Sequence, residues 1–407
     1  MEKIVLFKEK KDCCGCGACM NICPKNAITM VKDEYGFLYP QIDADKCISC
    51  GACKRVCAYQ NHKKEGEPLE AYAAVTKNTD IKKSASGGIF ASFAKKCLEM
   101  GGVVFGSSFE MCDEKLKPMH IGVNKLDDLV KLQGSKYVQS DSNMIFKEVK
   151  NALADNKNVL FSGTPCQVAA LKSFLGDKHY DNLFTIDIIC HGVPSIQMFQ
   201  DYLTILESSC GKIYDFKFRD KSGGWGYTGS AHYKDKKGYD KKLVIPFGVS
   251  SYVSMFLESD IFRENCYSCK YANANRVGDI TIGDYWGIEK EHAESLLDNG
   301  GCIDETKGVS CLIVNTQKGK QMLEDNKDNL VLVLSEFVKV QNGNKQLKAP
   351  GKKGRDREYI LELYKNEGYS AVEKWYRKKK GVKWYLSWGK CWIPISWKKK
   401  IKRVIRK

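Results

Sequence analysis

The sequence predicts a multidomain chain in which a small, cysteine-rich α+β module precedes a larger domain of mixed α/β type. Two observations support this fold class. Nine of the nineteen cysteines lie within the first 57 residues, and eight of these nine form two runs of identical spacing. From residue 69 onward, short apolar segments typical of strands alternate with segments of helical periodicity. With 407 residues, the chain is long enough for two or three domains with their own cores.

Each cysteine run has the spacing C-x2-C-x2-C-x3-C, and a proline follows the first run. This is the ligand pattern of bacterial ferredoxins with two [4Fe-4S] clusters, in which the fourth cysteine of one run binds the other cluster. The pattern therefore predicts a ferredoxin-like dicluster domain. We expect one cluster on Cys13, Cys16, Cys19 and Cys57, and a second on Cys47, Cys50, Cys53 and Cys23.

Other interpretations of these cysteines fit less well. A zinc ribbon uses two cysteine pairs separated by a longer spacer, not two quartets. A disulfide scaffold needs an oxidising compartment, and the charged residues 1–11 do not resemble a secretory signal. The cysteine content therefore indicates metal binding in a reducing cytoplasm. Cys14 breaks the spacing and is expected to be a bystander next to Cys13.

The net charge of +16 is concentrated at one end of the chain. Residues 370–407 carry fourteen Lys and Arg against one Glu, a net charge of +13, which leaves +3 for the other 369 residues. The near-neutral body does not indicate nucleic-acid binding. No stretch approaches eighteen apolar residues, which argues against a membrane-spanning helix.

The polar residues 61–68 are expected to link two domains. We expect the dicluster domain over residues 1–62, the α/β domain over 69–345 and a basic C-terminal tail over 346–407. Within the α/β domain, strands are predicted for residues 71–76, 103–106, 158–162, 183–189, 279–283 and 311–314. Helices are predicted for residues 89–100 and 166–175, and antiparallel hairpins within 216–249.

Two predicted strands end next to a cysteine, Cys166 and Cys190. Ligand sites of open α/β sheets lie at the carboxyl ends of strands, so both thiols are expected to face one crevice. Cys266 and Cys269 form a C-x2-C pair, and the four thiolates together suffice for a third [4Fe-4S] cluster. Zinc ligation and ordinary buried thiols are the alternatives.

A nucleotide or flavin site is indicated less sharply. Ser84, Ser86, Gly87 and Gly88 stand at the start of a predicted helix, where free backbone N–H groups suit a pyrophosphate. A plain serine cap would have the same sequence. Lys136, within the turn-rich residues 133–137, could contact a phosphate or lie in a solvated loop. No G-x-G-x-x-G follows a strand, so a Rossmann NAD site is not indicated.

Five short motifs occur in a fixed order: residues 84–88, 133–140, 163–167, 190–192 and 283–287. With them, residues 70–340 resemble the beta subunit of coenzyme F420-reducing hydrogenase and F420-dependent formate dehydrogenase. The resemblance implies an FAD-binding fold with an iron–sulfur cluster close to the flavin. It implies cluster ligation by Cys166, Cys190, Cys266 and Cys269. It also suggests Ser86, Gly87, Gly88, Gly163, Thr164 and Pro165 for the flavin. F420 itself does not follow, because relatives without F420 share these motifs.

His191 is the candidate catalytic residue, as a general acid beside the flavin. It could equally hydrogen-bond a cluster or pack in the core. Asp284 and Trp286 are ambiguous in the same way.

Five of the seven tryptophans lie in the basic tail, and Trp384, Trp388 and Trp392 recur every fourth residue. Tryptophan flanked by lysine is typical of a segment that lies on an anionic membrane surface. A terminal helix that packs on the body, or that binds a protein partner, has a similar composition.

Together these features predict a cytoplasmic iron–sulfur flavoprotein. Its tail is compatible with peripheral binding at the inner face of a membrane. It would move electrons between ferredoxin-type clusters and a small two-electron substrate at FAD, with a redox protein or ferredoxin as partner. The alternative is a non-catalytic electron-transfer subunit of a larger redox complex, which needs clusters but no flavin.

Overall fold

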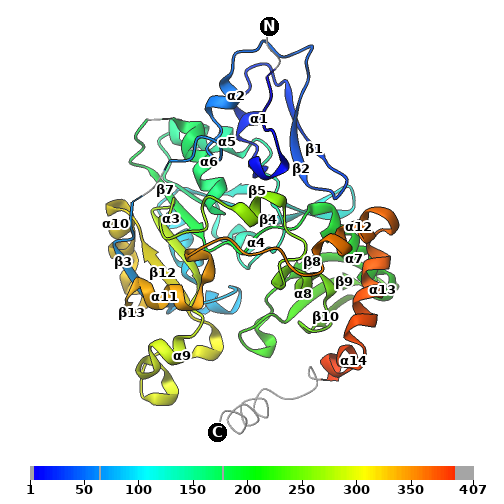
Figure 1. Cartoon of the computed structure of the whole chain (residues 1–407). Coiled ribbons are helices and arrows are strands. Elements are labelled where there is room, and N and C mark those ends of the chain that lie inside the picture. The colour runs from blue at the N-terminus through cyan, green and yellow to red at the C-terminus, as the bar shows by residue number, and fades with distance from the viewer. Residues whose placement is uncertain (1–3, 64–65, 177, 390–407) are drawn as a thin grey trace.

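The computed structural model describes residues 4–63, 66–176 and 178–389. Figure 1 shows a small N-terminal module standing on a larger body, with the described C-terminal helices on the side of the body away from β3. In the described part of the chain, every cysteine is a free thiol, and no helix is both long and apolar enough to cross a membrane.

The N-terminal module consists of two short helices and one pair of antiparallel strands. Residues 28–32 pair with residues 38–42, and each helix begins directly after a glycine of a cysteine run. Both of these glycines have φ angles in the left-handed region, +76° at Gly17 and +73° at Gly51. The elements are β1 (Ile28–Lys32), β2 (Leu38–Ile42), α1 (Ala18–Ile22) and α2 (Ala52–Arg55).

The body is built on an eight-stranded mixed sheet. Its strand order is β13-β3-β12-β11-β7-β6-β4-β5, in which β11, β7, β6 and β4 are parallel and the outer neighbours are antiparallel. The strands are β3 (Glu70–Thr76), β4 (Val103–Cys112), β5 (Lys115–Val123), β6 (Val159–Gly163), β7 (Leu183–Ile188), β11 (Ile280–Asp284), β12 (Ser310–Val314) and β13 (Leu330–Ser335).

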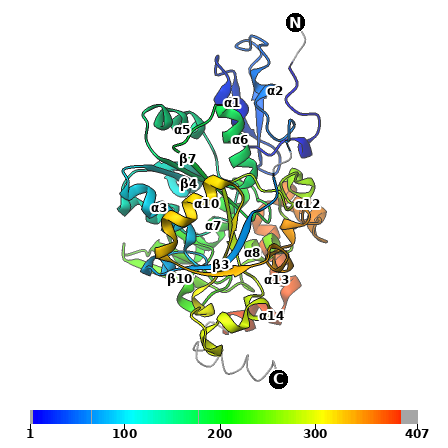
Figure 2. The same ribbon diagram turned by 90° about the vertical axis from the view of Figure 1, so that its left-hand side faces the viewer.

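Helices cover both faces of this sheet, as its central parallel strands require. Val159 and Phe161 of β6 pack in one core cluster, and Leu160 packs in another on the opposite face. Figure 2 shows α3 and α10 next to each other on one side of the sheet. The helices are α3 (Ile89–Glu99), α4 (Leu129–Leu132), α5 (Ile145–Ala154), α6 (Pro165–Leu175), α9 (Ile288–Glu291), α10 (Gln317–Asn326) and α11 (Phe337–Gly343).

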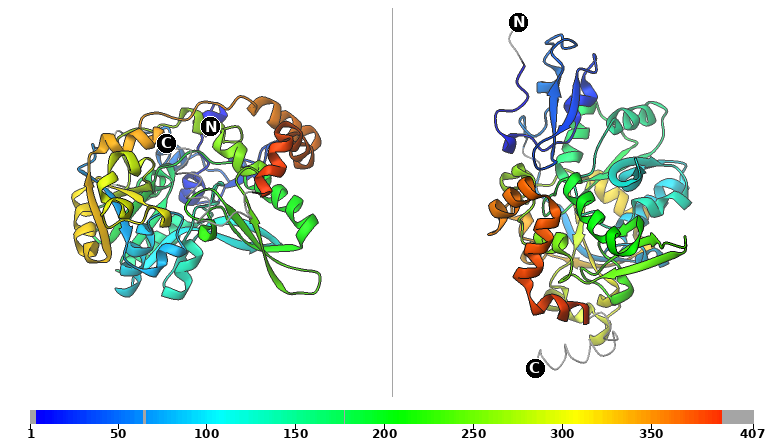
Figure 3. Two further views of the ribbon diagram at one scale, coloured as in Figure 1. Left: turned by 90° about the horizontal axis from the view of Figure 1, so that it is seen from below. Right: turned by 90° about the vertical axis from the view of Figure 1, so that its right-hand side faces the viewer.

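A second lobe of the body surrounds a three-stranded antiparallel sheet with the order β10-β9-β8. The hairpin expected within residues 216–249 is present as β9 and β10. The right-hand view of Figure 3 shows the orange and red C-terminal helices against green elements of this lobe. Its elements are β8 (Lys212–Lys217), β9 (Gly229–Lys234), β10 (Asp240–Ile245), α7 (Ile196–Cys210), α8 (Ser251–Leu257), α12 (Arg357–Glu367), α13 (Tyr369–Lys380) and α14 (Val382–Gly389).

The tail expected from residue 346 contains two helices that belong to the body. Ile360 of α12, together with Val372 and Tyr376 of α13, is buried, and Ile360 and Val372 share a core cluster with α7 and α8. This packing is caused by apolar residues at helical spacing, a pattern that the high lysine content hides in the sequence. The expected membrane-facing residues Trp392 and Trp397 lie outside the described residues.

Candidate functional site

A cavity of about 520 Å³ lies at the carboxyl ends of the parallel strands. Gly106 and Ser107 of β4, Gly163 of β6, Ile188 of β7 and Asp284 of β11 contribute to its wall. This is where ligands bind in open α/β sheets, and the volume is within the range of small-molecule pockets. The cavity is therefore the candidate functional site of the body.

All four cysteines of the predicted third cluster site line this cavity: Cys166, Cys190, Cys266 and Cys269. Cys166 is the second residue of α6, Cys190 follows β7, and the C-x2-C pair lies at the 3-10 turn η5 (Glu264–Ser268). We refer to them as the body set. Three chain segments that are far apart in the sequence thus bring the four thiols to one wall of the cavity.

The chemistry of the body set fits an iron–sulfur cluster. Burial raises the pKa of the Cys266 thiol to about 12 and that of Cys269 to about 11. Thiols in such surroundings remain protonated unless a metal compensates the charge of the thiolate. Four half-buried sulfur ligands from three chain segments are the donor set that a [4Fe-4S] cluster uses.

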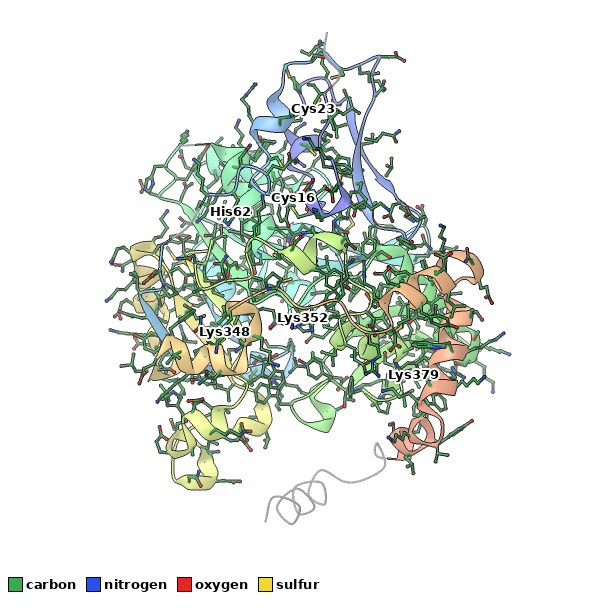
Figure 4. All side chains as sticks on the ribbon, viewed as in Figure 1. Cys16, Cys23, His62, Lys348, Lys352 and Lys379 are labelled. Carbon is green, nitrogen blue, oxygen red and sulfur yellow. The ribbon has the colours of Figure 1, made fainter. Side chains whose placement is uncertain are left out.

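The two ferredoxin-type sets lie at different distances from the body. Figure 4 shows the labelled Cys16 at the base of the module and the labelled Cys23 nearer its tip. The inner set is Cys13, Cys16, Cys19 and Cys57, and the outer set is Cys23, Cys47, Cys50 and Cys53. All four cysteines of the outer set line one small pocket, which fits the exchange of the fourth ligand between the two runs.

Cys14 connects the inner set with the body set and is more than a bystander. Its buried thiol has hydrogen-bonding contacts with both Cys16 and Cys166. Cys14 also belongs to a core cluster against which Cys57 and Cys269 pack. The hydrogen bond with Cys14 is the main reason why the pKa of Cys166 falls to about 7. The inner set and the body set are therefore neighbours.

The loops predicted for the flavin line the same cavity, with one exception. Ser86 and Gly88 precede α3, Gly163 and Thr164 precede α6, and Pro165 is the first residue of α6. Lys136 also lines the cavity. Thr164 forms a capping box with Gln167 at the start of α6, and its hydroxyl lies 3.2 Å from the Cys166 sulfur. Two helix N-termini thus open onto the cavity, which suits an anionic ligand.

Gly87 is the exception, because it faces the sheet and does not line the cavity. A Cβ atom at this position would lie 2.4 Å from the carbonyl oxygen of Ala74 and 2.8 Å from the backbone nitrogen of Ser310. Gly87 is therefore required for close packing against β3 and β12, and any side chain there would disturb the sheet before it met a ligand.

Two polar groups on the cavity wall have properties that fit a bound dinucleotide. The ammonium of the half-buried Lys136 donates to the carbonyl oxygens of Lys131 (3.0 Å) and Gln133 (2.9 Å), and desolvation lowers the pKa of Lys136 to about 7. The Ser107 hydroxyl is buried and has no hydrogen-bond partner among the described residues. A phosphate would restore the charge of Lys136, and a ligand atom would satisfy Ser107.

His191 lies on the cavity wall with both ring nitrogens in contact with protein groups. Nε2 lies 3.4 Å from the carbonyl oxygen of Leu257, and Nδ1 lies 2.5 Å from Nε2 of Gln346. Burial lowers the pKa of His191, so the ring is neutral at pH 7. The pattern assigns the proton to Nε2 and makes Nδ1 the acceptor.

A second histidine, His120, was not found by sequence reasoning. Its ring is buried on the same wall, 2.8 Å from the Ser140 hydroxyl and 3.2 Å from the Ser162 carbonyl oxygen. Burial lowers its pKa to about 4. His120 lies in β5, a strand that the sequence pattern did not reveal, so no local signal connected it with the site.

An aromatic group borders the cavity on the side of β11. Trp286 stacks on Trp225 with ring centroids 4.8 Å apart, and Arg219 lies 4.7 Å from the ring centre of Tyr227. The Arg219 guanidinium pairs with Asp284 at 2.8 Å. Asp284 and Trp286 thus both line the cavity, and their contacts with Arg219 and Trp225 connect them to the aromatic wall.

Comparison with known proteins finds two family matches that agree with the two parts of the chain. Residues 156–340 match the family model for the C-terminal part of the coenzyme F420 hydrogenase/dehydrogenase beta subunit, and residues 12–61 match the 4Fe-4S dicluster domain. A similar solved structure is the xenon-derivatised F420-reducing [NiFe] hydrogenase complex from Methanosarcina barkeri. The likeness has 17% identity and a TM-score of 0.41, and it covers 78% of this chain and 95% of that chain. No curated protein matches the chain.

Proposed function

We propose that this chain, whose residues 156–340 belong to the coenzyme F420 hydrogenase/dehydrogenase beta-subunit family, is an iron–sulfur flavoprotein oxidoreductase. It would move electrons between its ferredoxin-type clusters and a two-electron substrate, F420-like or other, at FAD. It would act with a redox protein or as a subunit of a larger redox complex. The dicluster domain provides two [4Fe-4S] clusters, and the body would add the flavin and a third cluster.

One observation carries this proposal: the body set, the flavin loops and Cys16 of the inner set line one cavity. Cys14 and Cys16 line the cavity together with Cys166, Ser86 and Lys136. Electron transfer between cofactors needs short distances and a dry path. The buried contact from Cys16 through Cys14 to Cys166 provides such a path from the module into the body.

The residues divide into two groups of proposed roles. Cys166, Cys190, Cys266 and Cys269 would hold the third cluster. Ser86, Gly88, Ser107, Lys136 and the 163–165 turn would hold the FAD, whose phosphates the helix N-termini and the lysine suit. Gly87 would support this loop from behind. When bound, FAD exchanges single electrons as well as electron pairs, so it can join one-electron carriers to a two-electron substrate.

His191 remains the proposed general acid, with a condition that the geometry sets. Because Leu257 and Gln346 engage both ring nitrogens, the histidine must exchange one partner before it can transfer a proton to a substrate. Gln346 belongs to residues 343–351, several of which line the cavity. A substrate that displaces this side chain would gain access to Nδ1. Because the resting ring is neutral with its proton on Nε2, it must take up a proton from solvent before Nδ1 can donate one.

Cofactor analysis of the anaerobically purified protein tests the proposal. We expect about twelve irons per chain, from three clusters of four, together with FAD. Cys166→Ala should reduce the iron content to about eight, whereas Cys112→Ala, which changes a half-buried cysteine far along β4, should leave it unchanged. About eight irons in the unaltered protein would disprove the third cluster.

Lys136 provides the matching test for the flavin. Lys136→Met removes the ammonium from the cavity wall and should weaken FAD binding, seen as loss of the flavin absorbance on gel filtration. Lys131→Met, a change of a surface lysine paired with Asp128, is the control and should retain the flavin. Twelve irons without any flavin in the unaltered protein would instead support the non-catalytic electron-transfer subunit.

A further inference from the structure

Four arginines of the body are deeply buried, and one of them lacks a carboxylate partner. Arg219 pairs with Asp284 at 2.8 Å, Arg276 with Asp187 at 3.0 Å and Arg357 with Glu264 at 3.0 Å. Arg263 is fully buried, and no ion pair joins it to a carboxylate of the described residues. Burial of an unpaired charge is costly, so another negative charge must stabilise this guanidinium.

The neighbours of Arg263 belong to the N-terminal module. Its guanidinium donates to the carbonyl oxygens of Cys13 (2.9 Å) and Leu38 (2.8 Å), and Nη2 lies 3.7 Å from the Cys13 sulfur. Its centre lies 3.8 Å from the centre of the Tyr39 ring, a cation–π contact. Because a Cβ atom on Gly15 would lie 3.0 Å from the guanidinium, the loop of the inner set closes directly over this charge.

The inner set therefore supplies the missing counter-charge. A cluster bound by Cys13 and its three companions carries negative charge, and each reduction adds one further unit. A buried cation beside it stabilises the more negative state, since the interaction is strong where water is excluded. The inference concerns only the dicluster domain and one arginine of the body.

The outer set has no comparable buried cation among the described residues. Its nearest arginine, Arg55, donates to the carbonyl oxygen of Cys50 at 3.0 Å, but both residues are exposed. Solvent and salt screen the charge of an exposed group. The two ferredoxin-type sites, alike in sequence, thus differ in electrostatic surroundings because only the inner one is covered by the body.

We infer that Arg263 is a positioning residue that keeps the reduction potential of the inner cluster above that of the outer one. An electron that leaves the outer cluster reduces the inner cluster by one unit, and the negative charge moves next to the guanidinium. An external one-electron carrier protein would replace the electron at the tip. Arg263 thereby favours electron flow from the tip toward the body.

Potentiometry of the anaerobic full-length protein, followed by EPR, tests this inference. The outer cluster is identified because a dissolved paramagnetic ion broadens its EPR signal more strongly than that of the inner cluster. In Arg263→Met, the reduction potential of the inner cluster should fall by at least 59 mV. This shift corresponds to a tenfold change in the distribution of one electron between the two clusters. Arg263→Lys keeps the charge and should shift the potential less. Arg55→Met is the matched control and should change neither potential.

Unchanged potentials in an Arg263→Met protein that retains its iron would overturn the inference. If Arg263→Met loses iron, the inference is tested on the unaltered protein and on Arg263→Lys. A reduction potential of the inner cluster at or below that of the outer cluster in these two proteins would refute the inference. Neither measurement involves the flavin or the third cluster, so failure of the proposed function would leave this test valid.

Discussion

At the scale of single residues, His120 makes the stability of the protein sensitive to acid. Burial lowers its pKa to about 4, whereas an unfolded histidine has a pKa near 6.5, so the unfolded state binds an additional proton between these values. The stability from the neutral ring is fully present above pH 6.5 and is lost progressively as the pH falls toward 4. At pH 5 the loss should be about 2 kcal/mol.

His120→Gln removes the titrating group and should reduce this loss. We expect a smaller difference in free energy of unfolding between pH 7.5 and pH 5 in the variant, measured anaerobically with urea. His179→Gln, a change of a histidine exposed next to Asp181, is the control and should behave as the unaltered protein does. An identical pH dependence in all three proteins would rule out the assigned role of His120.

Some residues of the site could be predicted from the sequence because their spacing carries the information. The two quartets and the C-x2-C pair follow a pattern that is local in the chain. Arg263 and Cys14 have no such pattern, since their importance arises from contacts with distant segments. Arg263 contacts Cys13, 250 residues away, and Cys14 contacts Cys166, about 150 residues away. Gly87 illustrates an intermediate case: the glycine motif was visible, but only packing against β3 and β12 reveals which of its residues faces the ligand.

At the scale of elements, α13 stabilises the second lobe although its sequence is rich in lysine. Tyr376 is 3% exposed, and its hydroxyl lies 2.7 Å from that of Ser254 and 3.1 Å from the Gly248 carbonyl oxygen. Tyr376→Ala should lower the free energy of unfolding by about 3 to 5 kcal/mol. Tyr385→Ala is the matched control on α14, because Tyr385 is 72% exposed. If Tyr376→Ala and the unaltered protein unfold at the same urea concentration, α13 does not stabilise the second lobe.

The same helix changes how a membrane contact must be tested. A deletion from residue 371 would remove three of the four buried residues of α13, so the deletion should begin after Lys380. Residues 381–407 carry nine Lys and Arg and no acidic residue, and α14 exposes Val382, Tyr385 and Leu386. We expect their removal to abolish sedimentation with anionic liposomes and to leave iron and flavin unchanged. Binding by the full chain should weaken, but persist, at high salt.

Local patterns predicted the central strands well and the peripheral elements poorly. The strand expected at residues 183–189 is β7 (Leu183–Ile188), and the helix expected at residues 89–100 is α3 (Ile89–Glu99). The central strand is covered on both faces and is an apolar run, whereas the helix shows the regular apolar spacing of a helix that packs on a sheet. By contrast, β5 and α12 each have an exposed side, and polar residues interrupt their patterns. Their positions depend on the tertiary contacts that cover the remaining side.

At the scale of the whole molecule, the body protects the inner set and leaves the outer set accessible. Cys50 is exposed, and the outer set lies toward the tip of the module (Figure 4), whereas Cys13 and Cys16 lie against Arg263 and Cys14. Oxidant and chelator should therefore remove four irons in a fast phase and the others more slowly. Iron release followed over time, with EPR of the remaining clusters, measures this order. Release in a single phase would contradict it.

The wide sequence span of the cavity wall also imposes an order on biosynthesis. The ribosome completes both ferredoxin-type cysteine sets by Cys57, the body set only at Cys269, and the cavity wall only at Gly351. Cluster insertion into the module can therefore begin while most of the chain is still being translated. The body set and the cavity wall are complete only after later segments have emerged. The two ferredoxin-type sets are therefore available for cluster insertion before the site in the body is complete.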